Sequence, residues 1–166
     1  MIKAMIVDDK TAAIELLRWI IKEKCPDINS VVSAISVSEA LPLIENFKPD
    51  LVFLDIQMPG KTGFDLLSEL ERTPEVIFTT AHSEFAIEAI KRSALDYLLK
   101  PINYIDLLGA VTRFEEKSKK QVQQNQLNIL IENMDAGDSA HKKIAIATET
   151  GFEFLKFNSI IYLEAQ

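Results

Sequence analysis

The segment LVFLDIQMPG (residues 51–60) decides the fold. Its first four residues are all apolar, a pattern typical of a strand that is buried on both faces, as in a parallel sheet. Pro59 and Gly60 then predict a turn, so the carboxylate of Asp55 comes where the buried strand ends. Because ligands of open α/β sheets bind beyond the carboxyl ends of the strands, Asp55 is the first candidate site residue.

Short apolar runs recur on both sides of this segment, and helical patterns separate them. We expect the five strands at residues 4–7, 31–35, 51–54, 76–79 and 97–99. We expect the helices at residues 11–24, 36–47, 63–71, 84–92 and from 103 onward. Such an alternation predicts an α/β fold with a doubly wound, five-stranded parallel sheet, and right-handed crossovers leave few topologies. Strand order 2-1-3-4-5 is our choice, because it places the first and third strands side by side.

Local signals mark some of the helix ends. Ser36 and Glu39 have the Ser-x-x-Glu spacing of a capping box, which predicts that a helix begins there. Pro26 follows the end of the helix expected over residues 11–24 and suits a helix stop.

The composition changes after residue 114. Residues 115–126 (EEKSKKQVQQNQ) contain one apolar residue and neither Gly nor Pro, so we expect an extended, solvated helix rather than a coiled-coil arm. A flexible break is expected over residues 135–139, and short strands at 143–147, 152–154 and 160–163. We divide the chain into residues 1–115, a helical or flexible linker over 116–141, and a β segment over 142–166 that is too short to fold alone.

The overall composition excludes several classes of protein. A net charge of −7 argues against a general nucleic-acid-binding surface. The one cysteine allows no internal disulfide, and the sequence shows no zinc-ligand spacing. Because we find neither a signal peptide nor an uncharged apolar stretch long enough to cross a bilayer, a cytoplasmic protein without a membrane partner is the default expectation.

Charged and hydroxyl side chains follow four of the predicted strands. Asp8 and Asp9 follow the first strand, Asp55 the third, Thr80 the fourth and Lys100 the fifth. Clustered carboxylates repel one another unless a cation lies among them, and their hard oxygen atoms suit Mg²⁺. A lysine and a hydroxyl beside them suit phosphate oxygens. Together these groups describe a site at which Asp55 attacks a phosphoryl group.

Each of these signals is weak by itself. A single Asp at a strand end is more often a turn former or helix cap, a Lys-Pro dipeptide is nearly uninformative, and a Thr at a strand end reflects β-propensity. What favours the functional interpretation is that all of them fall at the carboxyl ends of predicted parallel strands, on one edge of the sheet.

The same segments resemble the motifs of the receiver domain of two-component response regulators, a flavodoxin-like fold. The resemblance covers about residues 2–115 and rests on four motifs in family order: VDD (7–9), LDIQMPG (54–60), FTTA (78–81) and DYLLKP (96–101). It implies that Asp55 accepts a phosphoryl group from a sensor histidine kinase. It also implies that Asp8, Asp9, Asp55 and the main-chain carbonyl of Gln57 hold Mg²⁺.

The resemblance assigns further roles. Thr80 would be the switch hydroxyl, with Thr79 as the alternative, and Tyr97 the switch aromatic residue. Lys100 would pair with the phosphoryl group and precede a cis peptide bond to Pro101. Phosphorylation is expected to cause dimerisation through the face formed by about residues 84–111.

One position departs from the family pattern, and two others are expected to affect the rate of dephosphorylation. Lys10 stands where many receivers carry an acid, and we expect its side chain to point to solvent. Gln57 and His82 lie two residues beyond Asp55 and Thr80, positions that flank the path of the hydrolysing water in this family. We therefore expect Gln57 and His82 to tune the lifetime of phospho-Asp55.

The last residues resemble the opening strands of a LytTR-type DNA-binding domain, through IAIATETGFEF (144–154) and IIYLEA (160–165). This implies a transcriptional regulator whose full-length output domain binds DNA, whereas the present fragment is not expected to do so. Two other classes remain as alternatives. A phosphorylation-independent interaction module usually lacks an acid, the lysine or the hydroxyl, and an aspartate-nucleophile phosphatase carries an acid where this chain has Gln57.

Overall fold

The computed structural model describes residues 2–135, 143–148 and 151–156. The chain divides after Phe114 into two units, which are described separately below. None of the described helices combines the length and the apolar character that crossing a bilayer requires.

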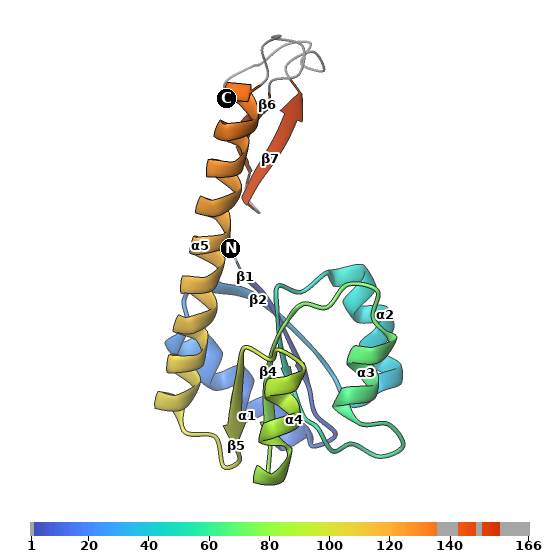
Figure 1. Cartoon of the computed structure of the whole chain (residues 1–166). Helices are drawn as coiled ribbons and strands as arrows, with labels where there is room; N and C mark the ends of the chain where they lie inside the picture. Colours follow the sequence, from blue (N-terminus) through green and yellow to red (C-terminus); the bar gives the residue numbers. More distant parts are fainter. Residues whose placement is uncertain (1, 136–142, 149–150, 157–166) are drawn as a thin grey trace. The chain divides into compact units, whose positions relative to one another are not determined.

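The first unit contains a five-stranded parallel sheet (Figure 1). Its strands are β1 (Ile2–Val7), β2 (Ile28–Ala34), β3 (Leu51–Leu54), β4 (Glu75–Thr80) and β5 (Asp96–Leu99). The order is β2-β1-β3-β4-β5, which confirms the predicted topology. Val7 pairs with both Ala34 and Leu54, and Leu54 pairs with Phe78, so β1, β2 and β3 end level with one another. This alignment brings the residues that follow the strands to one edge of the sheet.

Helices cover both faces of the sheet. They are α1 (Thr11–Lys24), α2 (Val37–Phe47), α3 (Gly63–Glu69), α4 (Ala86–Lys91) and α5 (Tyr104–Asp135), with a 3₁₀ turn, η1 (Ser83–Phe85), before α4. The helix expected over residues 84–92 is therefore divided, because its first turn is wound more tightly, as often happens at helix ends. The helix expected to reach residue 71 ends at Glu69.

Two hydrophobic cores lie on opposite faces of the sheet. Ala4 and Ile6 of β1 pack in a core with residues of α1 and α5, whereas Met5 and Val7 pack in a core with residues of α2 and α3. Because side chains alternate along a strand, an all-apolar strand serves both cores at once. Leu51–Leu54 is fully buried in this way, as its composition predicted.

The predicted capping box at α2 is only half correct. Ser36 Oγ accepts a hydrogen bond from the Glu39 backbone N–H (3.3 Å), but Glu39 Oε2 accepts from the N–H of Ile35 (3.1 Å) rather than of Ser36. The side chain reaches one residue too far for the reciprocal bond. A complete capping box occurs instead at α3, where Thr62 and Asp65 cap each other's backbone. The shorter Asp in place of Glu concealed this signal in the sequence.

The second unit continues α5 and adds a hairpin. The whole of α5 has 32 residues, so it is about 48 Å long, which confirms the extended helix. β6 (Lys143–Thr148) pairs antiparallel with β7 (Gly151–Lys156), as expected for the first two strands of the β segment. The strand expected at 160–163 and most of the break expected at 135–139 lie outside the described residues, while Asp135 itself belongs to α5.

Candidate functional site

Three carboxylates meet at the carboxyl edge of the sheet. The N–H of Asp55 donates to the Val7 carbonyl (2.8 Å) and the N–H of Asp8 donates to the Ala34 carbonyl (3.2 Å). The strand ladders thus extend one residue beyond β1 and β3 and fix both acids in place. One carboxylate oxygen each from Asp8, Asp9 and Asp55 lies within 4.8 Å of the others, and Asp8 and Asp55 are buried. The sequence prediction that these three residues cluster is confirmed.

The donor atoms of this cluster fit a hard divalent cation. Asp9 Oδ1 is buried and has no hydrogen-bond partner among the described residues. A buried carboxylate oxygen without a partner is costly, and three convergent carboxylates are the kind of ligands that Mg²⁺ takes together with water or phosphate oxygens.

Lys100 joins two of the acids. Its Nζ lies 2.6 Å from Asp8 Oδ2 and 2.7 Å from Asp55 Oδ2, and its side chain is 16% exposed. Burial opposes the charge of the ammonium group, but the hydrogen bonds that it donates to Asp55 and Asp8 outweigh burial and raise the pKa of Lys100 above its usual value. Lys100 therefore stays charged and partly neutralises the cluster. The Lys100–Pro101 bond is cis, as the resemblance implied.

The loop after Asp55 is held against the site by a glycine. Gly63 begins α3, its N–H donates to the Ile56 carbonyl (2.8 Å), and a Cβ at this position would lie 2.4 Å from the Asp55 carbonyl oxygen. Only glycine permits this approach of helix to strand end. Gly60 has a φ of +86°, as its turn position suggests. Sequence reasoning missed the role of Gly63; a glycine at the first position of a helix was the available signal.

The two predicted switch residues both bond the backbone of His82, one on each side of its Cα. Thr80 Oγ1 accepts from the backbone N–H of His82 (3.4 Å), and the Tyr97 hydroxyl donates to the His82 carbonyl. Burial of Tyr97, followed by the negative charges of Glu84 and Asp55, raises the pKa of its phenol. Thr79 is also fully buried, but its hydroxyl has no partner among the described residues.

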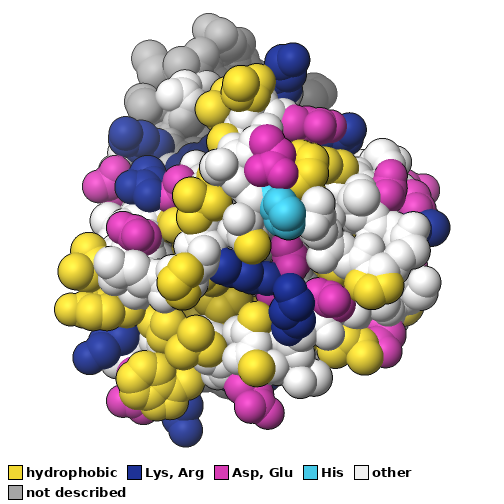
Figure 2. Space-filling view, turned by 90° about the horizontal axis from the view of Figure 1, so that it is seen from below, with side chains coloured by type: hydrophobic (Ala, Val, Ile, Leu, Met, Phe, Trp, Pro, Cys, Tyr) yellow, Lys and Arg dark blue, Asp and Glu magenta, His cyan; other side chains and the backbone are white. Residues whose placement is uncertain are grey.

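The remaining predicted residues lie around the rim. The Gln57 N–H donates to Asp55 Oδ1 (3.3 Å), and the Gln57 side chain is exposed. Lys10 is exposed, in agreement with the prediction, and its N–H donates to Asp8 Oδ1 (3.0 Å). His82 Nδ1 lies 3.0 Å from Glu84 Oε1. Figure 2 views the molecule from the edge where the strands end and shows basic and acidic side chains side by side there.

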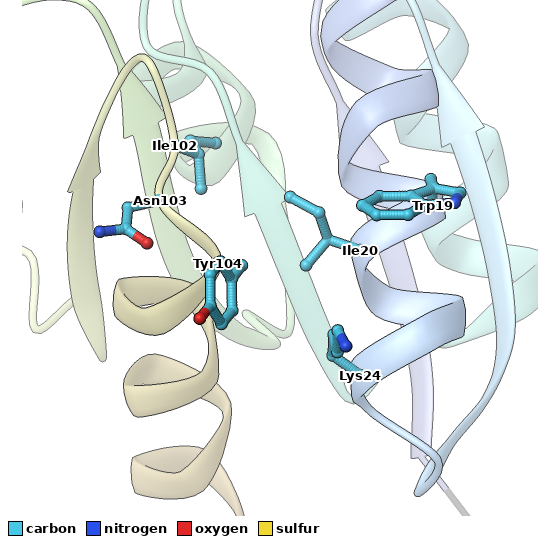
Figure 3. Close-up of a pocket in the computed structure, with 6 residues that line it drawn as sticks. All are labelled: Trp19, Ile20, Lys24, Ile102, Asn103 and Tyr104. Carbon is cyan, nitrogen blue, oxygen red and sulfur yellow. The ribbon is translucent and has the colours of Figure 1, made fainter.

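A separate hollow of about 510 Å³ lies between α1 and the start of α5 (Figure 3). Its walls are mainly aromatic and aliphatic, and no member of the acid cluster contributes to it. The lining residues are Trp19, Ile20, Lys24, Ile102, Asn103 and Tyr104.

Comparisons with known proteins agree with this geometry. Residues 4–112 match the family model for the response regulator receiver domain. The chain is 28% identical to the sensory transduction protein LytT of Bacillus anthracis, and the match covers 98% of this chain and 65% of LytT. It is 38% identical to the transcriptional regulatory protein BtsR of Escherichia coli, over 82% of this chain and 56% of that one.

A third relative, the positive alginate biosynthesis regulatory protein of Pseudomonas aeruginosa, is 36% identical over 97% of this chain and 64% of its own length. The chain thus spans less than two thirds of each of these relatives. Its match to LytT extends well beyond residues 4–112.

Two solved structures share the fold. A response regulator receiver domain protein of Clostridium thermocellum superimposes with a TM-score of 0.65 at 27% identity, covering 73% of this chain and 99% of that one. The response regulator protein TrrA of Thermotoga maritima, solved in complex with Mg²⁺-BeF, gives a TM-score of 0.61 at 28% identity. The match covers 69% of this chain and 99% of TrrA.

Proposed function

Because the chain belongs to the response regulator receiver family, whose members are phosphorylation switches rather than conventional enzymes, we propose that Asp55 accepts a phosphoryl group from a phosphohistidine of a sensor kinase. The observation that carries this proposal is the pair of buried carboxylates of Asp8 and Asp55 bridged by Lys100, beside a buried Asp9 oxygen without a partner among the described residues. It combines a nucleophile, a fixed cation and the ligands for a second cation.

The chemistry follows from these positions. An oxygen of Asp55 attacks the phosphorus atom, the bond from phosphorus to the histidine nitrogen breaks, and the imidazole leaves with the electron pair. Asp8, Asp9, Asp55 and the carbonyl of Gln57 would hold Mg²⁺, which supplies positive charge beside the phosphoryl oxygens. Lys100, already 2.7 Å from Asp55 Oδ2, supplies fixed charge on the other side.

The phosphoryl group changes the site by adding negative charge and acceptor oxygens. Thr80 turns its hydroxyl from the N–H of His82 toward a phosphoryl oxygen. Lys100 exchanges its bond to Asp8 for a bond to the phosphoryl group. Tyr97, whose hydroxyl donates to the carbonyl of His82, follows the loop. The added charge thus changes the packing of the helices and strands next to the site.

Magnesium dependence tests this function directly. Wild-type chain incubated with acetyl phosphate and Mg²⁺ is expected to gain the mass of one phosphoryl group, because the acid cluster needs a divalent cation before a dianion can approach it. Removal of the cation with EDTA is expected to abolish the gain, as measured by intact mass spectrometry. Equal uptake in EDTA would contradict the role of the acid cluster.

Phosphorylation is proposed to cause homodimerisation through the face formed by α4, β5 and α5. Ile87, Ile90 and Ile105 are 68%, 74% and 59% exposed on these elements, and Leu99 is 49% exposed. Exposed apolar side chains gathered on one face indicate an interaction surface.

Ile90→Lys is expected to keep the phosphorylated chain monomeric, because it places a charge on the apolar face. Sedimentation velocity of the phosphorylated wild type and variant measures this effect. Val122→Lys, at an exposed position of α5 beyond the residues that form the proposed face (about 84–111), is the matched control. A phosphorylated Ile90→Lys dimer as stable as the wild type would exclude this face.

The sensor kinase is proposed to dock over α1 and the hollow in Figure 3. α1 begins three residues after Asp8 and α5 begins four residues after Lys100, so both helices flank the acid cluster. Leu16 and Trp19 on α1 and Tyr104 on α5 are 47%, 59% and 51% exposed. A partner that brings its phosphohistidine to Asp55 covers this surface.

Trp19→Ala is expected to slow phosphotransfer from the kinase about tenfold or more, since a buried tryptophan is often a dominant contact of an interface. Uptake from acetyl phosphate is expected to stay unchanged, because the substitution leaves the acid cluster intact. Radiolabelled phosphotransfer measures the first rate, and Ile87→Ala serves as the control. An equal loss with both donors would place the defect in the fold and not in docking.

The proposed organisation of the chain is a receiver domain over residues 1–115, a helical linker over 116–141 and the first part of a LytTR-type DNA-binding domain over 142–166. The similarity to the transcriptional regulatory protein BtsR supports a transcriptional output. We expect DNA binding only from the full-length output domain, and we expect the protein to act in the cytoplasm.

A further inference from the structure

His82 is held from several sides although it lies in a loop. Its N–H donates to Thr80 Oγ1 and its carbonyl accepts from the Tyr97 hydroxyl, so its backbone is fixed at both ends. Its imidazole Nδ1 lies 3.0 Å from Glu84 Oε1. The ring also packs edge-on against Phe85, with centroids 6.0 Å apart.

The contact with Phe85 is itself anchored in the core. Phe85 packs on Phe64 (6.2 Å), and Phe64 packs on Phe78 of β4 (5.0 Å), in edge-to-face arrangements that aromatic rings favour. Phe64 follows Gly63, the residue that lies against the carbonyl of Asp55. The loop that carries His82 is therefore fixed to the same helix start that borders Asp55.

Apart from a bond to its own backbone N–H, the Glu84 carboxylate has the imidazole of His82 as its partner. Its side chain is 63% exposed, and an exposed contact of this kind adds little stability. The bond has a chemical consequence, however. A carboxylate that accepts from Nδ1–H fixes the imidazole as the Nδ1–H tautomer and leaves Nε2 with a free lone pair. The pKa of Glu84 is lowered, first by a bond to its own backbone N–H and then by His82, despite slight burial, so the acceptor stays ionised.

We propose that Glu84 is a positioning residue that fixes the tautomer and orientation of His82, so that Nε2 accepts a hydrogen bond from the water that hydrolyses phospho-Asp55. This inference rests on the proposed function, because it requires phosphorylated Asp55. It assigns a role to a residue that neither contacts the acid cluster nor belongs to the four motifs.

The reaction balances without any further reactant. The water oxygen attacks the phosphorus atom, the bond between phosphorus and the Asp55 oxygen breaks, and the carboxylate leaves with the electron pair. The proton lost by the water passes to His82 Nε2 and then to solvent, and inorganic phosphate is released. Groups that orient a metal-binding imidazole change affinity or activity about 10- to 100-fold, and we expect a group that orients a reacting imidazole to act on the same scale.

The first experiment measures the tautomer. The ¹⁵N spectrum of the imidazoles at about pH 8 is expected to show a proton on His82 Nδ1 in the wild type and in Glu84→Gln. Glu84→Ala is expected to shift it to Nε2. The chain has two histidines, and the spectrum of His82→Ala identifies the signal. An Nδ1–H tautomer retained in Glu84→Ala would overturn the proposal.

The second experiment measures the lifetime of phospho-Asp55 after removal of acetyl phosphate. Glu84→Ala is expected to lengthen the half-life about tenfold, and Glu84→Gln, which keeps an acceptor oxygen, is expected to restore the wild-type value to within about twofold. Glu88→Ala, whose carboxylate pairs with Arg92 on the next helix turn, is the matched control.

These outcomes distinguish a failure of the role of Glu84 from a failure of the phosphoacceptor role of Asp55. Equal half-lives in the wild type and Glu84→Ala would overturn the role of Glu84 and leave the phosphoacceptor role of Asp55 standing. A wild type that takes up no phosphate would overturn both. An equally long half-life in Glu84→Gln and Glu84→Ala would also contradict the proposal, because it would show that charge and not the hydrogen bond to Nδ1 matters.

Discussion

Asp55→Asn is expected to take up no phosphate from acetyl phosphate in the presence of Mg²⁺. The amide has nearly the shape of the carboxylate and can still contact Lys100, so the fold is expected to survive. It lacks the anionic oxygen that attacks phosphorus, and no other acid replaces it, because Asp8 is buried against Lys100 and Asp9 completes the proposed metal site. Intact mass spectrometry of the wild type and variant, recorded side by side, measures this loss.

The control for this experiment is Asp27→Asn. Asp27 is exposed and immediately precedes β2, at the edge of the sheet opposite to the acid cluster. The Asp27→Asn variant is expected to take up phosphate at the wild-type rate. Phosphate gained by folded Asp55→Asn in the same time as the wild type would mean that another residue is the acceptor.

Lys100→Met is expected to lower the free energy of unfolding in metal-free buffer by about 3 kcal/mol, because it leaves buried carboxylates without their cation. The side chain of Asp8 has no exposed surface and that of Asp55 is only 5% exposed, so water cannot replace the ammonium group easily. Added Mg²⁺ is expected to restore part of this loss, since it neutralises the same carboxylates. Urea denaturation in EDTA and in Mg²⁺ measures both effects.

The pH dependence gives this prediction a second readout. Because the pKa of Lys100 is raised in the folded state, its stabilisation is fully present below the usual lysine value of about 10.4 and is lost as the pH rises through the folded-state pKa. The difference between wild type and Lys100→Met is therefore expected to be constant from about pH 7 to about pH 10 and to shrink only above about pH 10.4.

Lys61→Met is the matched control, because the same substitution there breaks an exposed pair with Glu69 at a similar distance of 2.7 Å. It is expected to cost less than about 1 kcal/mol. If Lys100→Met in EDTA proved as stable as Lys61→Met, the ammonium group of Lys100 would not be what holds the carboxylates together.

Much of the fold follows from local sequence patterns. The run at residues 51–54 is buried on both faces because every residue in it is apolar. The alternation of strands and helices predicts the parallel sheet, and the choice of order 2-1-3-4-5, which places strands 1 and 3 side by side, agrees with the structure. The clustering of Asp8, Asp9 and Asp55 follows as well, because strands 1 and 3 are neighbours and end level with each other.

Other features depend on contacts between distant segments, which local patterns do not contain. The bonds from Lys100 to both Asp8 and Asp55 join residues 92 and 45 positions apart. The contact of Gly63 with the Asp55 carbonyl depends on how closely α3 approaches the end of β3. The choice of Ile35 rather than Ser36 as the partner of Glu39 is a matter of side-chain reach. Such details depend on how segments far apart in the sequence pack against one another.

The most direct test of the central claim is to locate the phosphoryl group in the chain. Sodium borohydride reduces an aspartyl phosphate to homoserine, so wild-type chain phosphorylated with acetyl phosphate and Mg²⁺ can be reduced, digested and sequenced by tandem mass spectrometry. We expect homoserine at residue 55 and aspartate at residues 8 and 9. Homoserine at residue 8 or 9, or unmodified aspartate at residue 55 in chain shown to carry phosphate before reduction, would contradict it.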